Sequence, residues 1–117
     1  MAQQTTEMTE LETAFLAIIG KFPYYMRPPY FSTNPTVLNT MATLGYHVIQ
    51  ADVDTLDWEY DTPSTIDTSI GIYENGINSG ATIDLSHDPL PTTVETLLPA
   101  MISFLASKGL TCECARF

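Results

Sequence analysis

Basic residues are the scarcest chemical group in this sequence. Only 4 of its 117 residues are Lys or Arg, against 14 Asp and Glu, and the formal net charge is −10. Proteins that bind nucleic acids draw their affinity for the phosphate backbone from Lys and Arg, so this composition argues strongly against a nucleic-acid partner. No apolar run approaches the roughly 20 residues of a membrane-spanning helix, so a membrane is not expected as a partner either.

Two further features are absent or scarce. The N-terminal stretch M-A-Q-Q-T-T-E-M-T-E has neither the basic segment nor the apolar core of a signal peptide, so no export is expected from it and the sequence assigns no location. The only cysteines are Cys112 and Cys114, whereas a zinc site built from cysteine pairs needs two such pairs. We interpret them as thiols of a final strand; the alternative is a disulfide to a partner outside this chain.

The length and the apolar content predict a modest globular fold. Apolar residues make up 44% of the chain, enough for one core. A complete (β/α) barrel takes about 200–250 residues, so 117 residues could supply only part of one. The sequence shows no linker, low-complexity tract or long repeat, and we expect a single domain over residues 1–117.

Helical and strand patterns alternate along the chain, starting with a helix. Alternation at this period predicts an α/β fold with parallel strands and flanking helices. Pro99 lies inside the fourth helix and should kink it, because proline lacks an amide donor and crowds the carbonyl of Glu95. The expected helices cover residues 9–20, 34–45, 62–80 and 92–109, and the expected strands 22–26, 46–51, 81–85 and 110–115.

Each predicted helix carries an apolar stripe, and three have recognisable start signals. Thr9 with Glu12 and Thr92 with Glu95 have the spacing of a capping box, and Asn34 precedes Pro35 as an N-cap. The expected inward-facing residues are Leu11, Phe15, Ile18 and Ile19; Val37, Leu38, Met41 and Leu44; Ile66, Ile70, Tyr73 and Ile77; and Val94, Leu97, Leu98, Met101, Ile102 and Leu105.

Polar side chains follow the first three predicted strands, at the point where each strand ends. Arg27 follows the first, an acidic loop of Asp52, Asp54 and Asp57 follows the second, and His87 follows the third. In parallel α/β folds the functional groups gather at the C-terminal ends of the strands. The sequence therefore predicts one site built from these three strand ends.

Each of these residues also has a structural interpretation. Arg27 could be a surface residue that pairs with one of the many acids, and Asp57 with Trp58 could form an acidic loop anchored to the core by the indole. His87 could be a solvated loop residue. His47 lies at a strand start, the end of such a sheet that serves stability, and we interpret it as structural.

The motifs R-P-P-Y, L-G-Y, D-x-D-x-x-D-W and I-x-L-x-H-D occur in that order. Together they resemble the later motifs of the polysaccharide deacetylases, the NodB-homology carbohydrate esterases, and most closely those of the fungal chitin deacetylases. The resemblance covers residues 11–109. It implies that the chain is the C-terminal half of a distorted (β/α) barrel. It also implies a metal-dependent hydrolase that removes N-acetyl groups from chitin or another N-acetylglucosamine polymer.

The resemblance implies catalytic roles for three residues of this chain. Arg27 would orient the catalytic base, His87 would be the general acid, and Asp57 would tune that acid by lying within hydrogen-bonding range of it. Amide hydrolysis needs a proton on the leaving nitrogen, which is the role a positioned histidine can fill near neutral pH.

Three further residues would contact the substrate. The resemblance implies that the backbone N–H of Tyr30 helps to stabilise the oxyanion and that Trp58 and Leu85 form walls of the acetyl pocket. A donor aimed at the developing oxyanion is a usual requirement of acyl-transfer chemistry.

Two motifs of the family are absent from these 117 residues. They are T-F-D-D, which supplies the base and a metal ligand, and H-x-x-x-H, which supplies two more ligands. We therefore expect no cofactor to be held by the chain's own motifs, although the resemblance implies a divalent metal, zinc, in complete relatives.

Three interpretations of the chain remain open on this basis. It could be half of a deacetylase site that is inactive alone and is completed by a missing N-terminal half, a non-catalytic carbohydrate-binding remnant, or an inert gene remnant. Half of a barrel has open strand edges, so self-association is also expected.

Overall fold

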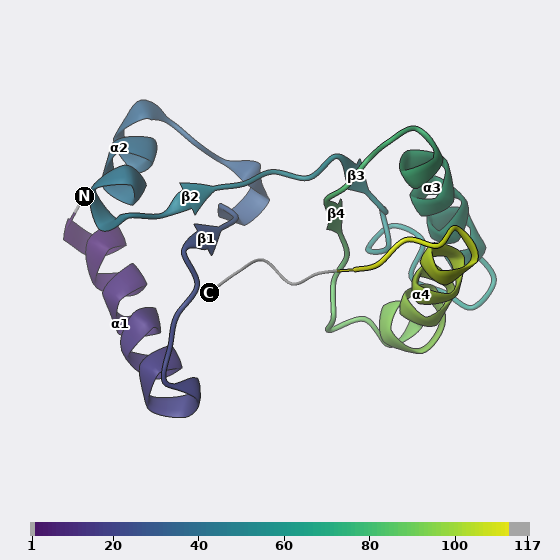
Figure 1. Cartoon of the computed structure of the whole chain (residues 1–117), viewed down its shortest axis with the longest axis horizontal. Coiled ribbons are helices and arrows are strands. Elements are labelled where there is room, and N and C mark those ends of the chain that lie inside the picture. The colour runs from purple at the N-terminus through teal and green to yellow at the C-terminus, as the bar shows by residue number, and fades with distance from the viewer. Residues whose placement is uncertain (1, 113–117) are drawn as a thin grey trace. The chain divides into compact units, whose positions relative to one another are not determined.

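A computed structural model describes residues 2–112 of the chain. Within these residues it forms two compact units, 2–50 and 51–112. Both units combine helices with a pair of short parallel strands (Figure 1). Parallel pairing is what the alternation of helix and strand patterns predicts.

The first unit consists of two helices and two strands. Helix α1 covers Ala2–Ile19, β1 covers Tyr25–Met26, α2 covers Pro35–Leu44 and β2 covers His47–Val48. A 3₁₀ turn, Pro29–Phe31, follows β1. In the parallel pair Tyr25 lies opposite His47 and Met26 opposite Val48.

Helix α2 begins and ends where its sequence predicts. The Asn34 side chain accepts a hydrogen bond from the backbone N–H of Val37 at 3.0 Å, and Pro35 occupies the first turn. Gly45 ends the helix in the left-handed conformation with φ 84°, which costs a glycine little because it has no Cβ. Met41 is buried and Leu38 is exposed, so the predicted inward face of α2 is too wide by one residue.

Helix α1 differs from the prediction at its start and on its surface. It begins at Ala2 rather than at residue 9, and the Thr9 hydroxyl donates to the carbonyls of Thr5 and Thr6 instead of capping a helix end. A threonine inside a helix can satisfy its hydroxyl in this way. Of the predicted apolar stripe, Phe15 is half-buried, whereas Leu11, Ile18 and Ile19 are exposed.

Tyr46 joins the two helices of the first unit. It lies directly after α2, it is buried, and its hydroxyl donates to Glu12 Oε1 of α1 at 3.0 Å. Burial raises the pKa of Tyr46 to about 12, and the hydrogen bond and negative charge of Glu12 act in the same direction. The neutral phenol is therefore the form that the folded unit stabilises.

Because of the hydrogen bond between Tyr46 and Glu12, we expect the first unit to lose stability at alkaline pH. Because the Tyr46 pKa is raised on folding, its contribution is complete below the ordinary tyrosine pKa of about 10 and disappears as the pH rises through about 12. Tyr46→Phe should cost about 1 kcal/mol at pH 8 and should weaken the decline above pH 10. Urea unfolding between pH 8 and pH 12 measures both effects. Tyr24→Phe, which alters a half-exposed phenol of the same unit, is the control and should leave the pH dependence intact.

The second unit contains the remaining elements. Strand β3 covers Val53–Asp54, α3 covers Ile66–Asn78, β4 covers Asp84–Leu85 and α4 covers Leu98–Ser107. A π-helical turn, Thr93–Leu97, runs directly into α4. Strands β3 and β4 are parallel, with Val53 opposite Asp84 and Asp54 opposite Leu85.

The stretch expected to form the second strand is divided. Residues 47–48 pair with β1, whereas residues 53–54 pair with β4, and the boundary between the two units falls after Gln50. Of the three acids expected in one loop, Asp52 therefore precedes β3, Asp54 lies in it and only Asp57 follows it. Of the expected last strand, residues 110–112 form no strand, and residues 113–115, with Cys114, lie outside the described part of the chain. Cys112 is an exposed free thiol.

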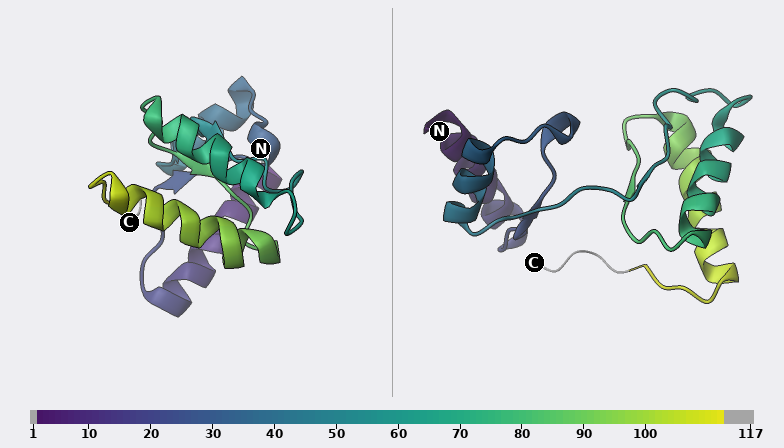
Figure 2. Two further views of the ribbon diagram at one scale, coloured as in Figure 1. Left: turned by 90° about the vertical axis from the view of Figure 1, so that its right-hand side faces the viewer. Right: turned by 90° about the horizontal axis from the view of Figure 1, so that it is seen from above.

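The core of the second unit lies between α3 and α4, which run side by side (Figure 2). Ile66 and Tyr73 of α3 are buried against Leu97 and Met101, and the predicted α3 stripe is confirmed, since Ile70 and Ile77 pack against the same cluster. The predicted face of the fourth helix is partly wrong. Leu105 packs on the core, but Val94, Leu98 and Ile102 are exposed.

The fourth helical segment departs from a regular α-helix just before Pro99. The N–H of Leu98 bonds to the carbonyl of Thr93, five residues earlier, and closes the π-helical turn. Proline at 99 has no N–H to donate and its ring would collide with the carbonyl of Glu95, and a π turn relieves this conflict by widening the backbone. Thr92 is already helical and makes no cap, so the predicted capping box is wrong there.

Helix α3 also starts later than predicted, at Ile66 rather than near residue 62.

Over residues 2–112, no helix combines the length and the apolar character needed to cross a lipid bilayer.

Candidate functional site

The loop after β3 turns Asp57 into the protein. Leu56 adopts the left-handed conformation with φ 53°, and its N–H donates to Asp54 Oδ1 at 3.1 Å. A leucine seldom adopts this conformation, which costs of order 1 kcal/mol or more. The carbonyl of Leu56 accepts from the backbone of Glu59 and Tyr60 at 2.9 and 3.1 Å. This tight turn leaves the Asp57 side chain fully buried.

Thr55 ties the ends of the two strands together. Its backbone N–H and its hydroxyl both donate to the carbonyl of Leu85, at 3.2 and 2.8 Å. The hydroxyl also lies 3.2 Å from Ser86 Oγ. Because Thr55 is fully buried, water does not compete for these bonds. The loops that follow β3 and β4 are thereby held next to each other.

Asp57 and His87 meet at this point. Asp57 Oδ1 lies 2.7 Å from His87 Nδ1, and Oδ2 accepts the backbone N–H of His87 at 2.6 Å. The remaining partners of the carboxylate are the backbone N–H of Trp58, 3.1 Å from Oδ1, and the hydroxyl of Thr93, 2.8 Å from Oδ2. Each carboxylate oxygen thus has two polar partners, which is what a buried carboxylate requires.

These contacts determine the charge of Asp57. Burial by itself raises the pKa of the Asp57 carboxyl, but the ring and backbone hydrogen bonds of His87 lower it. The Thr93 hydroxyl and the charge of His87 act in the same direction, and the resulting pKa is below the usual range. Asp57 is therefore an anion over the physiological pH range.

The His87 ring is held on one side and open on the other. Nδ1 faces Asp57, while 42% of the His87 side chain is exposed, so Nε2 is the ring nitrogen available to a ligand. A carboxylate on Nδ1 fixes the orientation and the tautomer of the ring, as in other carboxylate–histidine couples. The arrangement can deliver a proton from Nε2 to a bound molecule.

The two predicted walls of the acetyl pocket lie close to this couple along the chain. Trp58 directly follows Asp57, and 57% of its surface is exposed, so the alternative in which the indole anchors the loop to the core is wrong. Leu85 ends β4 and is half-buried, two residues before His87. Their contacts with a substrate stay predictions.

Arg27 and Tyr30, the other two predicted site residues, belong to the first unit. Arg27 Nη2 donates to the carbonyl of Gln50 at 3.4 Å, and its guanidinium lies 5.9 Å from the centre of the Phe31 ring. Tyr30 is fully exposed with φ 53°. The two hydrogen bonds of its turn are donated by Phe31 and Ser32, so they do not use the Tyr30 N–H that is predicted to face an oxyanion. The roles of Arg27 and Tyr30 stay predictions.

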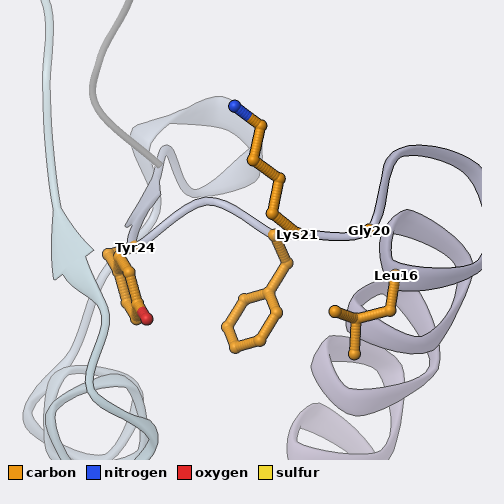
Figure 3. A pocket seen from close by; sticks show the side chains of 5 residues that line it. Leu16, Gly20, Lys21 and Tyr24 are labelled. Atoms are coloured by element: carbon orange, nitrogen blue, oxygen red, sulfur yellow. The ribbon is translucent and has the colours of Figure 1, made fainter.

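Two other features of the first unit lie outside this set of residues. His47 is exposed, and the centre of its ring lies 5.2 Å from the centre of the Tyr25 ring; its structural role stays a prediction. An open hollow of about 300 Å³ is lined by Leu16, Gly20, Lys21, Phe22 and Tyr24, with Leu16 on one side and Tyr24 on the other (Figure 3). None of the predicted site residues lines this hollow.

The described residues do not fit a zinc site. No group of three His, Cys, Asp or Glu side chains within residues 2–112 is arranged to hold a metal ion, whereas a catalytic zinc normally has three protein ligands. Asp52 instead accepts the N–H and the hydroxyl of Thr82 at 3.0 and 3.1 Å, and the backbone hydrogen bond is the main reason why its pKa is lowered.

Thr93 is the polar contact that sequence reasoning missed. The pattern T-T-V-E predicts a capping role for Thr92, but the Thr92 hydroxyl donates to Asp61 and the Thr93 hydroxyl donates to Asp57. No sequence signal distinguishes the two threonines, because the π-helical turn determines which way each one faces.

Comparisons with known proteins agree with the motifs. No protein-family model matches the chain. The chain is 50% identical over 107 residues to a chitin deacetylase of Pestalotiopsis sp, covering 92% of this chain and 36% of that protein. A chitin deacetylase of Arthroderma benhamiae is 42% identical over 105 residues, covering 89% of this chain and 28% of that protein. The chain therefore spans less than half the length of these relatives.

Solved structures show the same relationship. The chitin deacetylase of Colletotrichum lindemuthianum superposes with a TM-score of 0.85 at 35% identity, over 93% of this chain and 50% of that one. A family 4 carbohydrate esterase of Streptomyces lividans, in complex with acetate, gives a TM-score of 0.80 at 28% identity, over 97% and 56%. These similarities confirm the partial α/β-barrel class, and they confirm that the chain resembles part of the polysaccharide deacetylases, including fungal chitin deacetylases.

Proposed function

We propose that this chain supplies the proton-donating side of a polysaccharide deacetylase site. The observation that carries the proposal is the contact between buried Asp57 and half-exposed His87. His87 Nδ1 lies 2.7 Å from Asp57 Oδ1, and Nε2 is the ring nitrogen available to a ligand. His87 would protonate the leaving nitrogen as an N-acetyl group is hydrolysed, and Asp57 would keep the ring oriented. Trp58 and Leu85 would flank the acetyl group.

The substrate class follows from the relatives. The protein of Pestalotiopsis sp is a chitin deacetylase, and a relative from Bacillus cereus, 30% identical, is a peptidoglycan-N-acetylglucosamine deacetylase. An N-acetylglucosamine polymer is therefore the proposed partner, within a single partial deacetylase domain over residues 1–117. Arg27 would orient a base and the N–H of Tyr30 would face the oxyanion, once further polypeptide supplies that base and the metal.

A chimera tests this function. The segment of the Colletotrichum lindemuthianum enzyme that aligns with this chain is replaced by the residues of this chain, and acetate release from chitin oligomers is measured. We expect activity in the chimera and a loss of about 100-fold or more with His87→Gln, since a general acid contributes about that factor. Asp88→Asn, at an exposed neighbouring acid, is the control and should have little effect. A folded but inactive chimera, or one indifferent to His87→Gln, would refute the proposal.

The 117-residue chain alone is expected to release no acetate and to bind no stoichiometric zinc, because it lacks the motifs T-F-D-D and H-x-x-x-H.

The second candidate, a carbohydrate-binding protein without catalysis, is favoured by one observation, the exposure of Trp58. Trp58 is the only tryptophan, so its fluorescence reports directly on sugar binding. A saturable change with chitin oligomers, lost in Trp58→Ala, together with an inactive chimera would favour this second function.

A further inference from the structure

We propose that Thr93 is a positioning residue for the Asp57–His87 couple and that the π-helical turn at Thr93–Leu97 places its hydroxyl there. The proposal rests on the proposed function only in assigning proton donation to the Asp57–His87 couple. Thr93 is buried, its Oγ1 donates to Asp57 Oδ2 at 2.8 Å, and it lies 36 residues from Asp57 along the chain. It has no contact with substrate in the proposed chemistry and acts through the carboxylate.

The Thr93 hydroxyl restricts rotation of the Asp57 carboxylate about its terminal side-chain torsion. The terminal torsion of an aspartate is broad, so the plane of its carboxylate is held by hydrogen bonds and not by a rotamer preference. On Oδ2 the two donors are the His87 N–H and the Thr93 hydroxyl. They come from the loop after β4 and from the helix, and together they fix the carboxylate plane. With Oδ2 held, Oδ1 stays aimed at His87 Nδ1.

The backbone of the fourth helical segment explains why a threonine hydroxyl reaches this carboxylate. The π-helical turn closes with the bond from Leu98 N–H to the Thr93 carbonyl, and it precedes Pro99, whose ring forbids regular α-helical bonding to Glu95. Single π-helical turns inside α-helices occur frequently at functional sites. Here the turn directs consecutive hydroxyls onto two acids, since Thr92 donates to Asp61 and Thr93 to Asp57.

The test uses the full 117-residue chain and nuclear magnetic resonance of the His87 ring nitrogens and the Asp57 carboxyl carbon. In the wild type the neutral ring should carry its proton on Nδ1, facing Asp57. Thr93→Val removes the hydroxyl and keeps the shape. It should convert the ring to a mixture of both tautomers and shift the carboxyl titration midpoint of Asp57 upward. Thr93→Ser keeps the hydroxyl and should preserve the wild-type signals.

Two further variants separate positioning from stability. Thr92→Val removes the neighbouring hydroxyl and should leave the His87 tautomer unchanged, whatever it does to unfolding. Pro99→Ala keeps every side chain of the couple and lets the helix return towards α-helical bonding, so it should give part of the Thr93→Val effect. His47, exposed in the first unit, provides an internal reference whose ring signals should not move.

Specific outcomes would overturn the proposal. A wild-type tautomer and an unshifted Asp57 midpoint in Thr93→Val would show that the hydroxyl does not position the couple. A change in Thr93→Ser with wild-type signals in Thr93→Val would show that packing of the methyl group matters instead. If Thr93→Val does not fold, Thr93→Ala carries the same expectation. None of these measurements depends on deacetylation, so an inactive chimera would refute the proposed function and leave this result standing.

Discussion

Replacing Gly76 by alanine is expected to destabilise the protein by about 3 kcal/mol, because a well-packed interior has no room for the added methyl group. A Cβ at this position would lie 2.1 Å from Cγ2 of Val53 and 3.3 Å from two further atoms of that side chain. Val53 is buried in β3 and its branched side chain is stiff at χ1. The clash can therefore be relieved only by moving α3 away from β3, the strand that leads into Asp57.

The matched control is in the same helix. A Cβ at Gly71 meets no atom within 4 Å, so Gly71→Ala should stabilise α3 by about 0.5–1 kcal/mol through backbone entropy alone. Val53→Ala should recover part of the loss in the Gly76→Ala background, because it removes the colliding methyl groups. Urea unfolding of the three variants gives the values. Equal effects of the two glycine substitutions would contradict the close approach of α3 and β3.

The second large effect is expected from Asp57→Asn. The buried carboxylate has four polar partners, and an amide can accept at only one of its two ends, so at least one buried donor is opposed by another donor. Loss of one partner of a buried charged network costs about 3–5 kcal/mol. We expect about 3 kcal/mol, because His87 is partly exposed and can find water. Asp54→Asn, which removes the same charge from the half-buried acid at the end of β3, should cost less than about 1.5 kcal/mol.

The same substitution should change the acid sensitivity of the fold. The pKa of Asp57 is lower in the folded state than in the unfolded chain. Its contribution is therefore complete above the ordinary aspartate pKa of about 3.9 and is lost as the pH falls through the lower folded pKa. Wild-type stability should decline in this range, and Asp57→Asn should decline less. Parallel declines of the wild type and Asp57→Asn between pH 5 and pH 2 would show that the carboxylate is not the acid-sensitive group.

Features that depend on neighbouring residues could be predicted from the sequence. The Asn34–Pro35 start and the Gly45 end of α2 require only local chemistry, and both are confirmed. The stripe of α3 is confirmed because apolar residues at helical spacing must face one side. The contact of Asp57 with His87 follows from a simple rule, since each residue comes shortly after one of two paired parallel strands.

Features that depend on long-range packing could not be predicted in the same way. Nothing in the run from Tyr46 to Asp54 shows that its two ends pair with different strands. The fourth helix has more apolar residues than one face can bury, and periodicity alone does not show that Leu97 and Met101 are buried while Leu98 and Ile102 are exposed. Pro99 predicts a distortion in that helix, but its form as a π-helical turn depends on the surrounding contacts.

The π-helical turn also sets the rotational phase of the segment that contains it. Along a regular α-helix, residues four apart drift by about 40° around the axis, so a row at positions 93, 97, 101 and 105 would wind away from any flat surface. In this chain Thr93, Leu97 and Met101 are all buried, and Leu105 packs on the core. The wider turn compensates for part of the drift. A deletion of one residue between 93 and 97 would shorten the five-residue bond from Leu98 to Thr93 to the four-residue spacing of an α-helix. Later side chains such as Met101 would then keep their phase, while Thr93 would lose the wide turn that places its hydroxyl on Asp57.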